Sequence, residues 1–127
     1  MQDKNYIKFW GVRGTFPTTS RSHAKYGGNT SCVELRLNDH LIIFDAGTGL
    51  RNLGCTLIQE NKKHNLDILI SHTHLDHILG FPFFKPFFDS SYCCRLWAGH
   101  LNPERKLKDV LSNMMTEPFF PIPLDIF

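Results

Sequence analysis

The chain has 127 residues, of which 42% are hydrophobic and 20% are charged, with a formal net charge of +2. This length and composition place it among globular proteins of about one small domain. The net charge is too small to indicate nucleic-acid binding by itself, and no apolar run reaches the length that spans a membrane.

The first part of the chain predicts three strands. A strand at residues 6–10 is followed by a long segment rich in Gly, Thr and Ser. Residues 32–37 alternate polar and apolar side chains with a period of two, which predicts a half-buried strand. Asn38 and Asp39 form a tight turn, and the chain is expected to return as a paired strand at residues 40–44.

Helices then alternate with strands, which indicates an α/β fold. Thr48 is a suitable N-cap for a helix that runs to about Lys62 with its leucines on one face. A later helix is expected at residues 103–114, because Asn102 and Pro103 are good start signals. Two short apolar runs predict further strands at residues 66–70 and 93–97.

Three imidazoles and one carboxylate follow the first of these runs directly, in His72-Thr73-His74-Leu75-Asp76-His77. Neutral imidazole and carboxylate are the ligands that suit zinc, manganese or iron. A polar loop after a buried strand is the alternative interpretation, but four such groups at the spacing H-x-H-x-D-H are hard to explain by chance or solvation. The motif therefore predicts a metal site.

The spacing also favours two metal ions. Beyond a strand, alternate residues point the same way, so we expect His72 and His74 to converge on one ion. Asp76 is expected at the N-cap of a short helix, and Asp76 and His77 project differently from the earlier histidines, which suits a second ion. Two ions about 3.5–4 Å apart are the usual device for attack on phosphate esters. A dinuclear hydrolase is therefore favoured over a structural zinc site, which more often uses cysteines.

This motif resembles the signature of the metallo-β-lactamase superfamily. The block Phe44-Asp45-Ala46-Gly47-Thr48-Gly49 is similar to the turn before the first helix in that superfamily. Two further blocks, Phe9-Trp10-Gly11-Val12-Arg13-Gly14-Thr15 and Gly27-Gly28-Asn29-Thr30-Ser31-Cys32, resemble its phosphodiesterase and tRNase Z-like branch. The order and spacing of the four blocks agree with that branch up to about residue 82.

The resemblance implies an αββα sandwich built from two similar halves, and this chain is long enough for about one. Residues 1–127 are therefore expected to form a single partial domain, the N-terminal half of the sandwich, with a mixed sheet flanked by helices. The chain stops in an apolar run at residues 121–127, which favours a cut through a domain because termini are usually polar and exposed.

The resemblance also implies roles for the site residues. His72 and His74 would bind the first metal ion, Asp76 and His77 the second, and Asp76 would orient or deprotonate the attacking water. The implied cofactors are two divalent ions, zinc foremost, with manganese or iron as alternatives. Asp45 is either a carboxylate that fixes the orientation of a histidine ligand or an Asp that ends a strand before a glycine turn, and both interpretations stay open.

The second half of the family's ligand set is missing from this chain. The resemblance leads us to expect another histidine, a bridging aspartate and a last histidine downstream. His100 is the only histidine after His77, and we interpret it as a loop histidine. Asp109 lies in a predicted helix and Asp125 lies two residues from the end, so neither has the strand-then-turn setting of a bridging ligand.

These observations predict a metal-dependent hydrolase that acts on phosphodiester bonds through a metal-activated water. Thioester, lactone and sulfate esters stay open as substrates, because the first-half motif serves them all. The alternative is a catalytically incomplete half-domain that needs a partner, either a second copy in a homodimer or a complementing C-terminal half. A flavin-linked di-iron relative is a weaker alternative.

Residues 81–88 are dense in aromatic side chains and contain two prolines. They line a substrate cleft, stack a base or dock a partner in one interpretation, and form a buried helix-and-turn in the favoured one. His23, His40 and His64 have no nearby partner ligands in the sequence and are expected at the surface.

The expected compartment is the cytoplasm. The four cysteines show no C-x-x-C spacing and predict free thiols, which fit a reducing environment. The residues before Tyr6 also lack the apolar stretch of a secretory signal, and no association with a membrane is expected.

Overall fold

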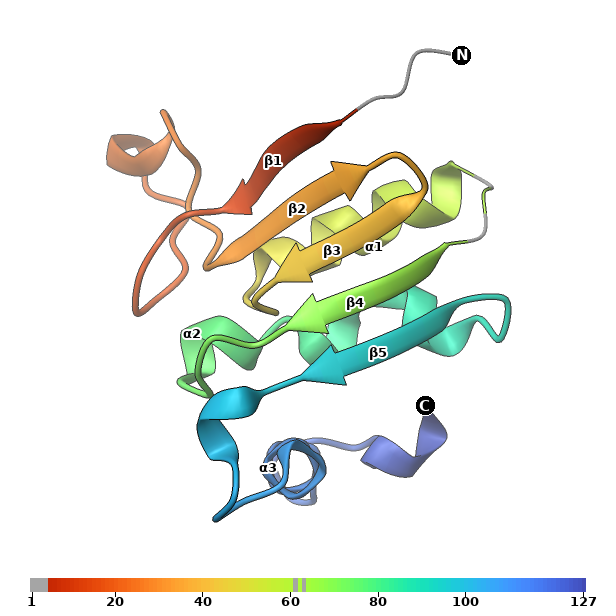
Figure 1. Cartoon of the computed structure of the whole chain (residues 1–127). Coiled ribbons are helices and arrows are strands. Elements are labelled where there is room, and N and C mark those ends of the chain that lie inside the picture. Colours follow the sequence, from red (N-terminus) through yellow and green to blue (C-terminus); the bar gives the residue numbers. More distant parts are fainter. Residues whose placement is uncertain (1–4, 61, 63) are drawn as a thin grey trace.

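Five strands form one mixed sheet in chain order (Figure 1). The computed structural model describes residues 5–60, 62 and 64–127. β1, β2 and β3 pair antiparallel, whereas β3, β4 and β5 pair parallel. The predicted α/β fold with a mixed sheet is therefore confirmed. The strand bounds are β1 Tyr6–Gly11, β2 Cys32–Leu37, β3 His40–Phe44, β4 Asn65–Leu69 and β5 Cys93–Trp97.

The direction of each pair follows from its connection. The two residues between β2 and β3 make a tight turn, which joins antiparallel neighbours, whereas parallel strands need a longer crossover. α1 (Gly49–Gln59) crosses from β3 to β4, and a segment that begins with α2 (Leu75–Ile78) crosses from β4 to β5. The remaining elements are α3 (Leu107–Met114) and the short 3-10 helices η1 (Arg21–His23), η2 (Phe81–Phe83), η3 (Lys85–Phe88), η4 (Gly99–Leu101) and η5 (Leu124–Ile126).

One edge of the sheet gathers the ends of four strands. β1, β3, β4 and β5 run in the same direction, so their carboxyl ends lie along this edge, beside α2 (Figure 1). The segments that follow β1, β3 and β4 therefore come together although they are far apart in the sequence. The predicted metal motif belongs to the last of these segments.

The hydrophobic core lies between the sheet and α1. Leu50, Leu53 and Leu57 of α1 are fully buried and follow the helical spacing of one face. They pack in one cluster with alternate residues of the parallel strands, such as Ile43 and Ile68. Full burial of each such side chain contributes about 1.5–3 kcal/mol. α1 is thus held on the sheet mainly by its leucine stripe.

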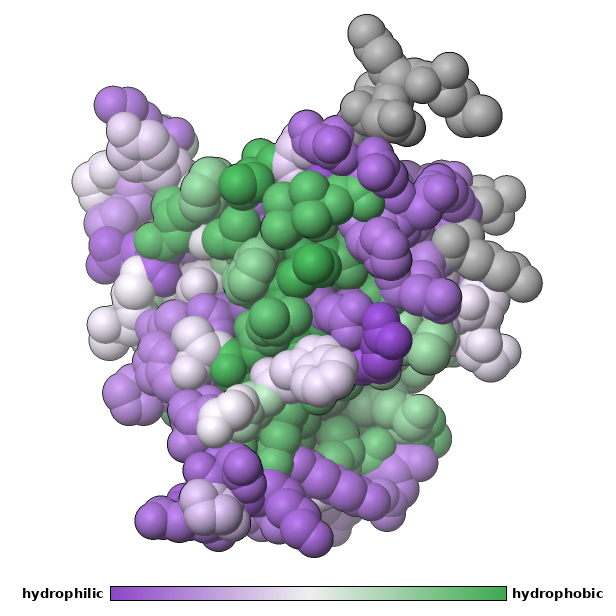
Figure 2. Space-filling view, in the orientation of Figure 1, coloured by the Kyte–Doolittle hydropathy of each residue, from purple (hydrophilic) through white to green (hydrophobic). Residues whose placement is uncertain are grey.

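The opposite face of the sheet carries exposed apolar side chains. Phe9 is 65% exposed, Phe44 40% and Trp97 55%, and all three lie in register across β1, β3 and β5. Figure 2 shows the apolar side chains as a continuous patch on the viewer's side, while α1 lies behind the sheet in Figure 1. We call this surface the open face. Its other apolar members are Ile7, Val33, Leu35, Ile42 and Leu69.

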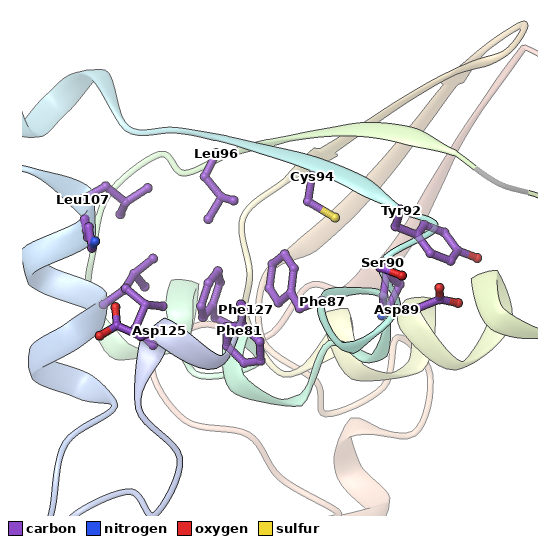
Figure 3. Close-up of a pocket in the computed structure, with 14 residues that line it drawn as sticks. Phe81, Phe87, Asp89, Ser90, Tyr92, Cys94, Leu96, Leu107, Asp125 and Phe127 are labelled. Atoms are coloured by element: carbon purple, nitrogen blue, oxygen red, sulfur yellow. The ribbon is translucent and has the colours of Figure 1, made fainter.

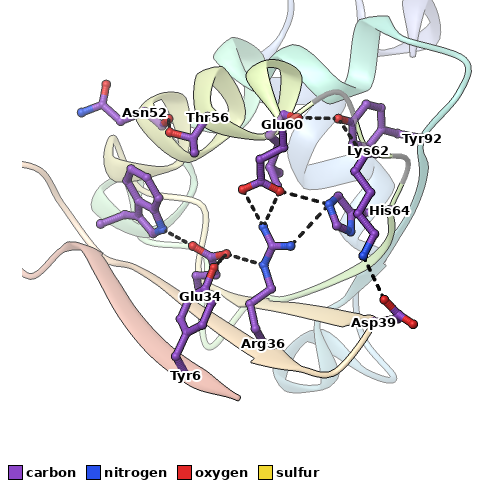
Figure 4. A network of polar contacts seen from close by, with 12 residues as sticks. Tyr6, Glu34, Arg36, Asp39, Asn52, Thr56, Glu60, Lys62, His64 and Tyr92 are labelled. Atoms are coloured by element: carbon purple, nitrogen blue, oxygen red, sulfur yellow. Dashed lines mark hydrogen bonds and ion pairs between the residues drawn. The ribbon is translucent and has the colours of Figure 1, made fainter. Parts of the chain in front are cut away.

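β2 is half-buried as predicted, but two of its three buried side chains, those of Glu34 and Arg36, are charged. Glu34 is 1% exposed and Arg36 is 9% exposed, beneath α1. Arg36 pairs with Glu34 and with Glu60, and Glu34 also accepts hydrogen bonds from Tyr6 Oη (2.9 Å) and Trp10 Nε1 (2.7 Å) (Figure 4). Buried charges need such partners, because an unpaired one is costly to remove from water. The pairing explains why β2 turns its apolar side to the open face.

The surface position expected for His64 is wrong. His64 is 4% exposed, and its Nε2 lies 3.2 Å from Glu60 Oε2 and 3.3 Å from Arg36 Nη1 (Figure 4). The partners that hold it come from β2 and from the end of α1. Burial, together with the nearby Arg36 charge, lowers the pKa of His64 from its ordinary value. His23 is only partly exposed, whereas His40 is exposed as expected.

Two predicted helix starts need correction. α3 begins at Leu107, not near Pro103, because Lys106 is extended and residues 102–106 offer no apolar side chain to pack on the core. In α2 the N-cap residue is His74, which is extended and whose carbonyl accepts a hydrogen bond from His77 N–H, so Asp76 lies inside the helix.

Other sequence expectations have mixed outcomes. All four cysteines are free, as predicted. None of the described helices is long and apolar enough to cross a lipid bilayer. Residues 1–4, which carry most of the argument against a signal segment, lie outside the described residues, as do residues 61 and 63.

Candidate metal centre

Main-chain hydrogen bonds fasten the turn after β3 to the segment after β4. Ala46 N–H donates to the carbonyl of His77 (2.8 Å), and Gly80 N–H donates to the carbonyl of Ala46 (2.9 Å). Gly47 lies in the same turn, where a Cβ atom would be 2.5 Å from Thr30 Oγ1 and closer still to the carbonyl oxygen of Asp76. Only glycine fits at this position, and the close approach sets the position of the histidine segment.

Asp45 is the polar centre of this turn. Its carboxylate accepts hydrogen bonds from Ser71 N–H (2.8 Å), Ser71 Oγ (2.9 Å) and Ser31 Oγ (3.2 Å), and Oδ2 lies 2.8 Å from His77 Nδ1. The residue is only 7% exposed and adopts a left-handed backbone conformation (φ 64°). Of the two interpretations of Asp45, the structure supports the one in which it orients a histidine.

The bond from His77 to Asp45 determines the tautomer of that imidazole. A carboxylate oxygen accepts hydrogen bonds, and the 2.8 Å contact of Nδ1 with Asp45 is shorter than the 3.4 Å contact of Nε2 with Asp76. The geometry therefore assigns the proton of the neutral ring to Nδ1. The lone pair of Nε2 is then available to a metal ion. This carboxylate–histidine pairing is the usual arrangement behind a metal-bound imidazole.

The three imidazoles of the motif cluster together at the carboxyl edge of the sheet. The ring centroids of His72 and His74 are 4.6 Å apart, and those of His72 and His77 are 4.0 Å apart. Ser71 Oγ lies 3.0 Å from His72 Nδ1 and also donates to the carboxylate of Asp45. This serine therefore links an imidazole of the cluster to Asp45. The structure thus brings all three predicted histidine ligands together.

Asp76 completes the cluster from the first turn of α2. Its Oδ2 accepts a hydrogen bond from the main-chain N–H of Thr15 (2.9 Å) and lies 3.4 Å from His77 Nε2. The Thr15 amide is the main cause that holds the pKa of Asp76 below its ordinary value, with the neighbouring imidazoles acting in the same direction. The carboxylate is therefore ionised and available as a ligand near neutral pH.

The chemistry of these donors fits a zinc-like ion, and one pair also fits in spacing. Two ligands about 2.1 Å from a tetrahedral ion lie roughly 3.4 Å apart, which is the separation of Asp76 Oδ2 and His77 Nε2. Within residues 5–60, 62 and 64–127, however, no group of three or more His, Cys, Asp or Glu side chains is arranged to hold one ion. The donors are gathered but do not form a closed cage.

The later candidates lie on three other elements of the chain. His100 lies on η4, Asp109 on α3 and Asp125 on η5, and none of them makes a hydrogen bond or ring contact with the motif among the described residues. Their interpretation as residues outside the ligand set stays a prediction.

The aromatic segment 81–88 mostly packs, as favoured. Phe81 and Phe84 are buried, with Phe84 against Gly54 of α1. Phe81 and Phe87 also line a cavity of about 640 Å³ between β5, α3 and the end of the chain, together with Phe127 (Figure 3). None of the residues that line this cavity belongs to the histidine cluster.

Sequence reasoning missed three residues that contact the cluster. Ser31 and Ser71 donate to Asp45, and Thr15 donates to Asp76. Ser31 and Thr15 stand inside blocks that had been singled out for their glycines, and Ser71 comes directly before the motif. Their positions in or beside these motifs were a signal of a role at the site. The sequence alone does not show that they donate to Asp45 and Asp76.

Comparison with known proteins decides the family. Residues 26–125 match the model of the metallo-beta-lactamase superfamily. The chain belongs to this superfamily. It is 26% identical over 119 residues to a ribonuclease Z from Haloarcula marismortui, in an alignment that covers 91% of this chain and 35% of that protein. The metallo-β-lactamase chain thus spans about a third of the length of this curated relative.

A solved structure from Thermotoga maritima, described as a metallo-beta-lactamase, is also similar. It has a TM-score of 0.41 and 21% sequence identity, and the match covers 71% of this chain and 42% of that chain.

Proposed function

We propose that this metallo-β-lactamase family member is a metal-dependent hydrolase of phosphodiester bonds. The observation that carries the proposal is the chain of contacts Asp45–His77–Asp76, in which one carboxylate fixes an imidazole tautomer and the freed Nε2 lies 3.4 Å from the second carboxylate. Similarity to a ribonuclease Z supports a phosphodiester as the substrate class. Thioesters, lactones and sulfate esters are the alternative substrates.

Each residue of this centre has its own proposed role. His72 and His74 would hold one divalent ion and Asp76 and His77 would hold a second, with zinc as the first choice and manganese or iron as alternatives. Such ions supply a hydroxide near neutral pH and offset negative charge on phosphoryl oxygens. Asp45 keeps the proton on Nδ1 of His77. Asp76 orients the attacking water and accepts its proton.

Hydrolysis of bis(p-nitrophenyl) phosphate by the full 127-residue chain, with zinc or manganese added, tests this function. His74→Ala is expected to abolish the metal-dependent turnover, because it removes one of the three imidazoles of the cluster. His100→Ala is the matched control, since it removes an exposed imidazole that makes no hydrogen bond or ring contact with the cluster among the described residues, and it is expected to leave turnover unchanged. Equal turnover in both variants would place the activity elsewhere.

A second candidate function is a partial domain that is active only with a partner. Two observations favour it: the ligand cage is not closed among the described residues, and the open face exposes Phe9, Phe44 and Trp97. Exposed apolar patches of this kind mark interaction surfaces. The partner is a second copy of the chain or a complementing C-terminal half, and residues 1–127 then form one partial domain. The free thiols support a cytoplasmic location for either candidate.

Light scattering coupled to size-exclusion chromatography separates the two candidates. If a second copy covers the open face, the chain elutes as a dimer, and Phe9→Glu, which places a charge on that face, yields a monomer with a lower turnover per chain. A wild-type monomer with full turnover would contradict the need for a partner.

A further inference from the structure

A strained turn follows β1 at the carboxyl edge of the sheet. The N–H of Phe16 donates to the carbonyl of Gly14 (2.8 Å), and the residue between them, Thr15, has a φ of 68°. A hydrogen bond across three residues with a positive central φ is the rarer and more strained form of the γ-turn. A β-branched residue in this region is an outlier, and such outliers cluster at functional sites.

Arg13 holds this turn in place from its other side. Its Nε donates to the carbonyl of Phe16 (3.3 Å) and its Nη1 contacts Nε2 of His23 (2.6 Å). Its main-chain N–H donates to the carbonyl of Asn29 (2.9 Å). The turn is thus braced by contacts with the middle and with the end of the long segment between β1 and β2.

The turn directs one donor to the candidate metal centre. The N–H of Thr15 donates to Asp76 Oδ2 at 2.9 Å, although the two residues are 61 positions apart. The same oxygen lies 3.4 Å from His77 Nε2. A carboxylate oxygen has two lone pairs, so the amide takes one and leaves the other for an ion beside His77.

We propose that Thr15 is a positioning residue, whose main-chain N–H fixes the carboxylate plane of Asp76 so that Oδ2 and His77 Nε2 present themselves to one metal ion. The proposal rests on the proposed function. It assigns a role to the turn, which holds the N–H of Thr15 within hydrogen-bond distance of Asp76. The side chain of Thr15 is not needed for this role.

Replacing the single amide N–H of Thr15 by an ester oxygen is the sharpest test. The Ser31–Cys32 junction allows a synthetic segment 1–31 to be ligated to residues 32–127 and the full chain to be refolded. Loss of a partner that orients a ligand weakens metal binding roughly tenfold to a hundredfold, and we expect such an increase in the zinc Kd, measured by competition with a chromophoric chelator. The control is the same ester at Ser20, whose N–H donates to Thr18 Oγ1 and to no other atom of residues 5–60, 62 and 64–127.

Two recombinant variants give a matched comparison. Thr15→Gly keeps the N–H and accepts a positive φ, so its zinc Kd is expected to equal that of the natural chain. Thr15→Pro removes the N–H and excludes the positive φ, so it is expected to bind zinc as weakly as the ester. An unchanged zinc Kd in a folded Thr15 ester chain would overturn the proposal.

A readout without metal separates this proposal from the proposed function. If the natural chain binds no zinc, the proposed function fails, and the χ1 rotamer of Asp76 is measured instead from three-bond couplings in the metal-free chain. Couplings that fit one χ1 rotamer of Asp76 in the natural chain, and an average over several rotamers in the Thr15 ester chain, would support a positioning role. Identical couplings in both chains would overturn it.

Discussion

Nδ1 of His77 donates a hydrogen bond of 2.8 Å to Oδ2 of Asp45, which stands at the end of a neighbouring strand. The two residues are 32 positions apart, and the parallel pairing of β3 with β4 brings them to the same edge of the sheet. An imidazole held in this way keeps one tautomer and one orientation, and both are needed before Nε2 can serve as a ligand.

Replacement of Asp45 by Asn is therefore expected to weaken zinc binding roughly tenfold to a hundredfold. The amide keeps the size of the side chain but has only one oxygen, so it cannot accept both from Ser71 N–H and from His77 Nδ1–H as the two carboxylate oxygens do. Zinc Kd values from chelator competition check the expectation. Asp39→Asn is the control, because Asp39 is an exposed carboxylate in the turn after β2. Equal affinities of the two variants would argue against the role of Asp45.

The contributions of the buried charges beneath α1 to the free energy of unfolding are expected to depend on one another. Glu34→Ala leaves the guanidinium of Arg36 with only Glu60 as a charged partner, and breaking a buried ion pair costs about 3–5 kcal/mol. We expect a loss near the lower end of this range, because Glu60 remains. Urea unfolding of Glu34→Ala and of the double variant Glu34→Met, Arg36→Leu measures the coupling. A single variant that is more stable than the double variant would contradict it.

His64 is expected to make the stability of the fold depend on pH. Its pKa is lowered in the folded chain, so the unfolded chain binds the proton more readily. The contribution of neutral His64 is present above the unfolded pKa of about 6.5 and is lost as the pH falls through the folded value. Urea unfolding at about pH 7.5 and pH 5.5 should show a smaller pH difference for His64→Gln than for the natural chain.

His40→Gln serves as the control for His64, since His40 is exposed on β3. The control is expected to keep the pH difference of the natural chain. If His64→Gln also keeps that difference, the stability loss at low pH must come from other groups, such as the histidine cluster.

Gly47 is expected to tolerate no side chain. A Cβ atom there would meet Thr30 Oγ1 at 2.5 Å and the carbonyl oxygen of Ser31 at 2.7 Å, which forces the turn after β3 away from the histidine segment. Overpacking of this kind destabilises by on the order of 1–3 kcal/mol. Gly99→Ala is the matched control, because an added Cβ at Gly99 meets nothing within 4 Å. Equal midpoints of thermal unfolding in the Gly47→Ala and Gly99→Ala chains would contradict the close approach at Gly47.

Local sequence patterns predicted the strands well. The bounds of β2, β3 and β5 agree with the expectation, since alternation of side chains and a two-residue turn are local signals. The start of α3 was wrong because Asn102 and Pro103 are weak signals where residues 102–106 have no apolar side chain to bury. Tertiary packing decided that boundary.

Long-range pairing was invisible in the sequence. The burial of His64 depends on Arg36 and Glu60, and the contact between Thr15 and Asp76 joins two segments that meet only at the carboxyl edge of the sheet. By contrast, the convergence of His72 and His74 was predicted from their spacing. The ring of His77 was expected to project differently, yet it lies even nearer to His72. Short-range motifs thus predicted which residues form the candidate centre, while the contacts that orient them required the fold.

Zinc content tests the central claim most directly. The purified full chain is loaded with zinc and passed through a desalting column, and the bound metal is counted by mass spectrometry for the natural chain, His77→Ala and His100→Ala. We expect zinc to stay with the natural chain and with His100→Ala, and to be lost from His77→Ala, whose imidazole links Asp45 to Asp76. Equal zinc in all three chains, or none in the natural chain, would contradict a metal centre at this motif.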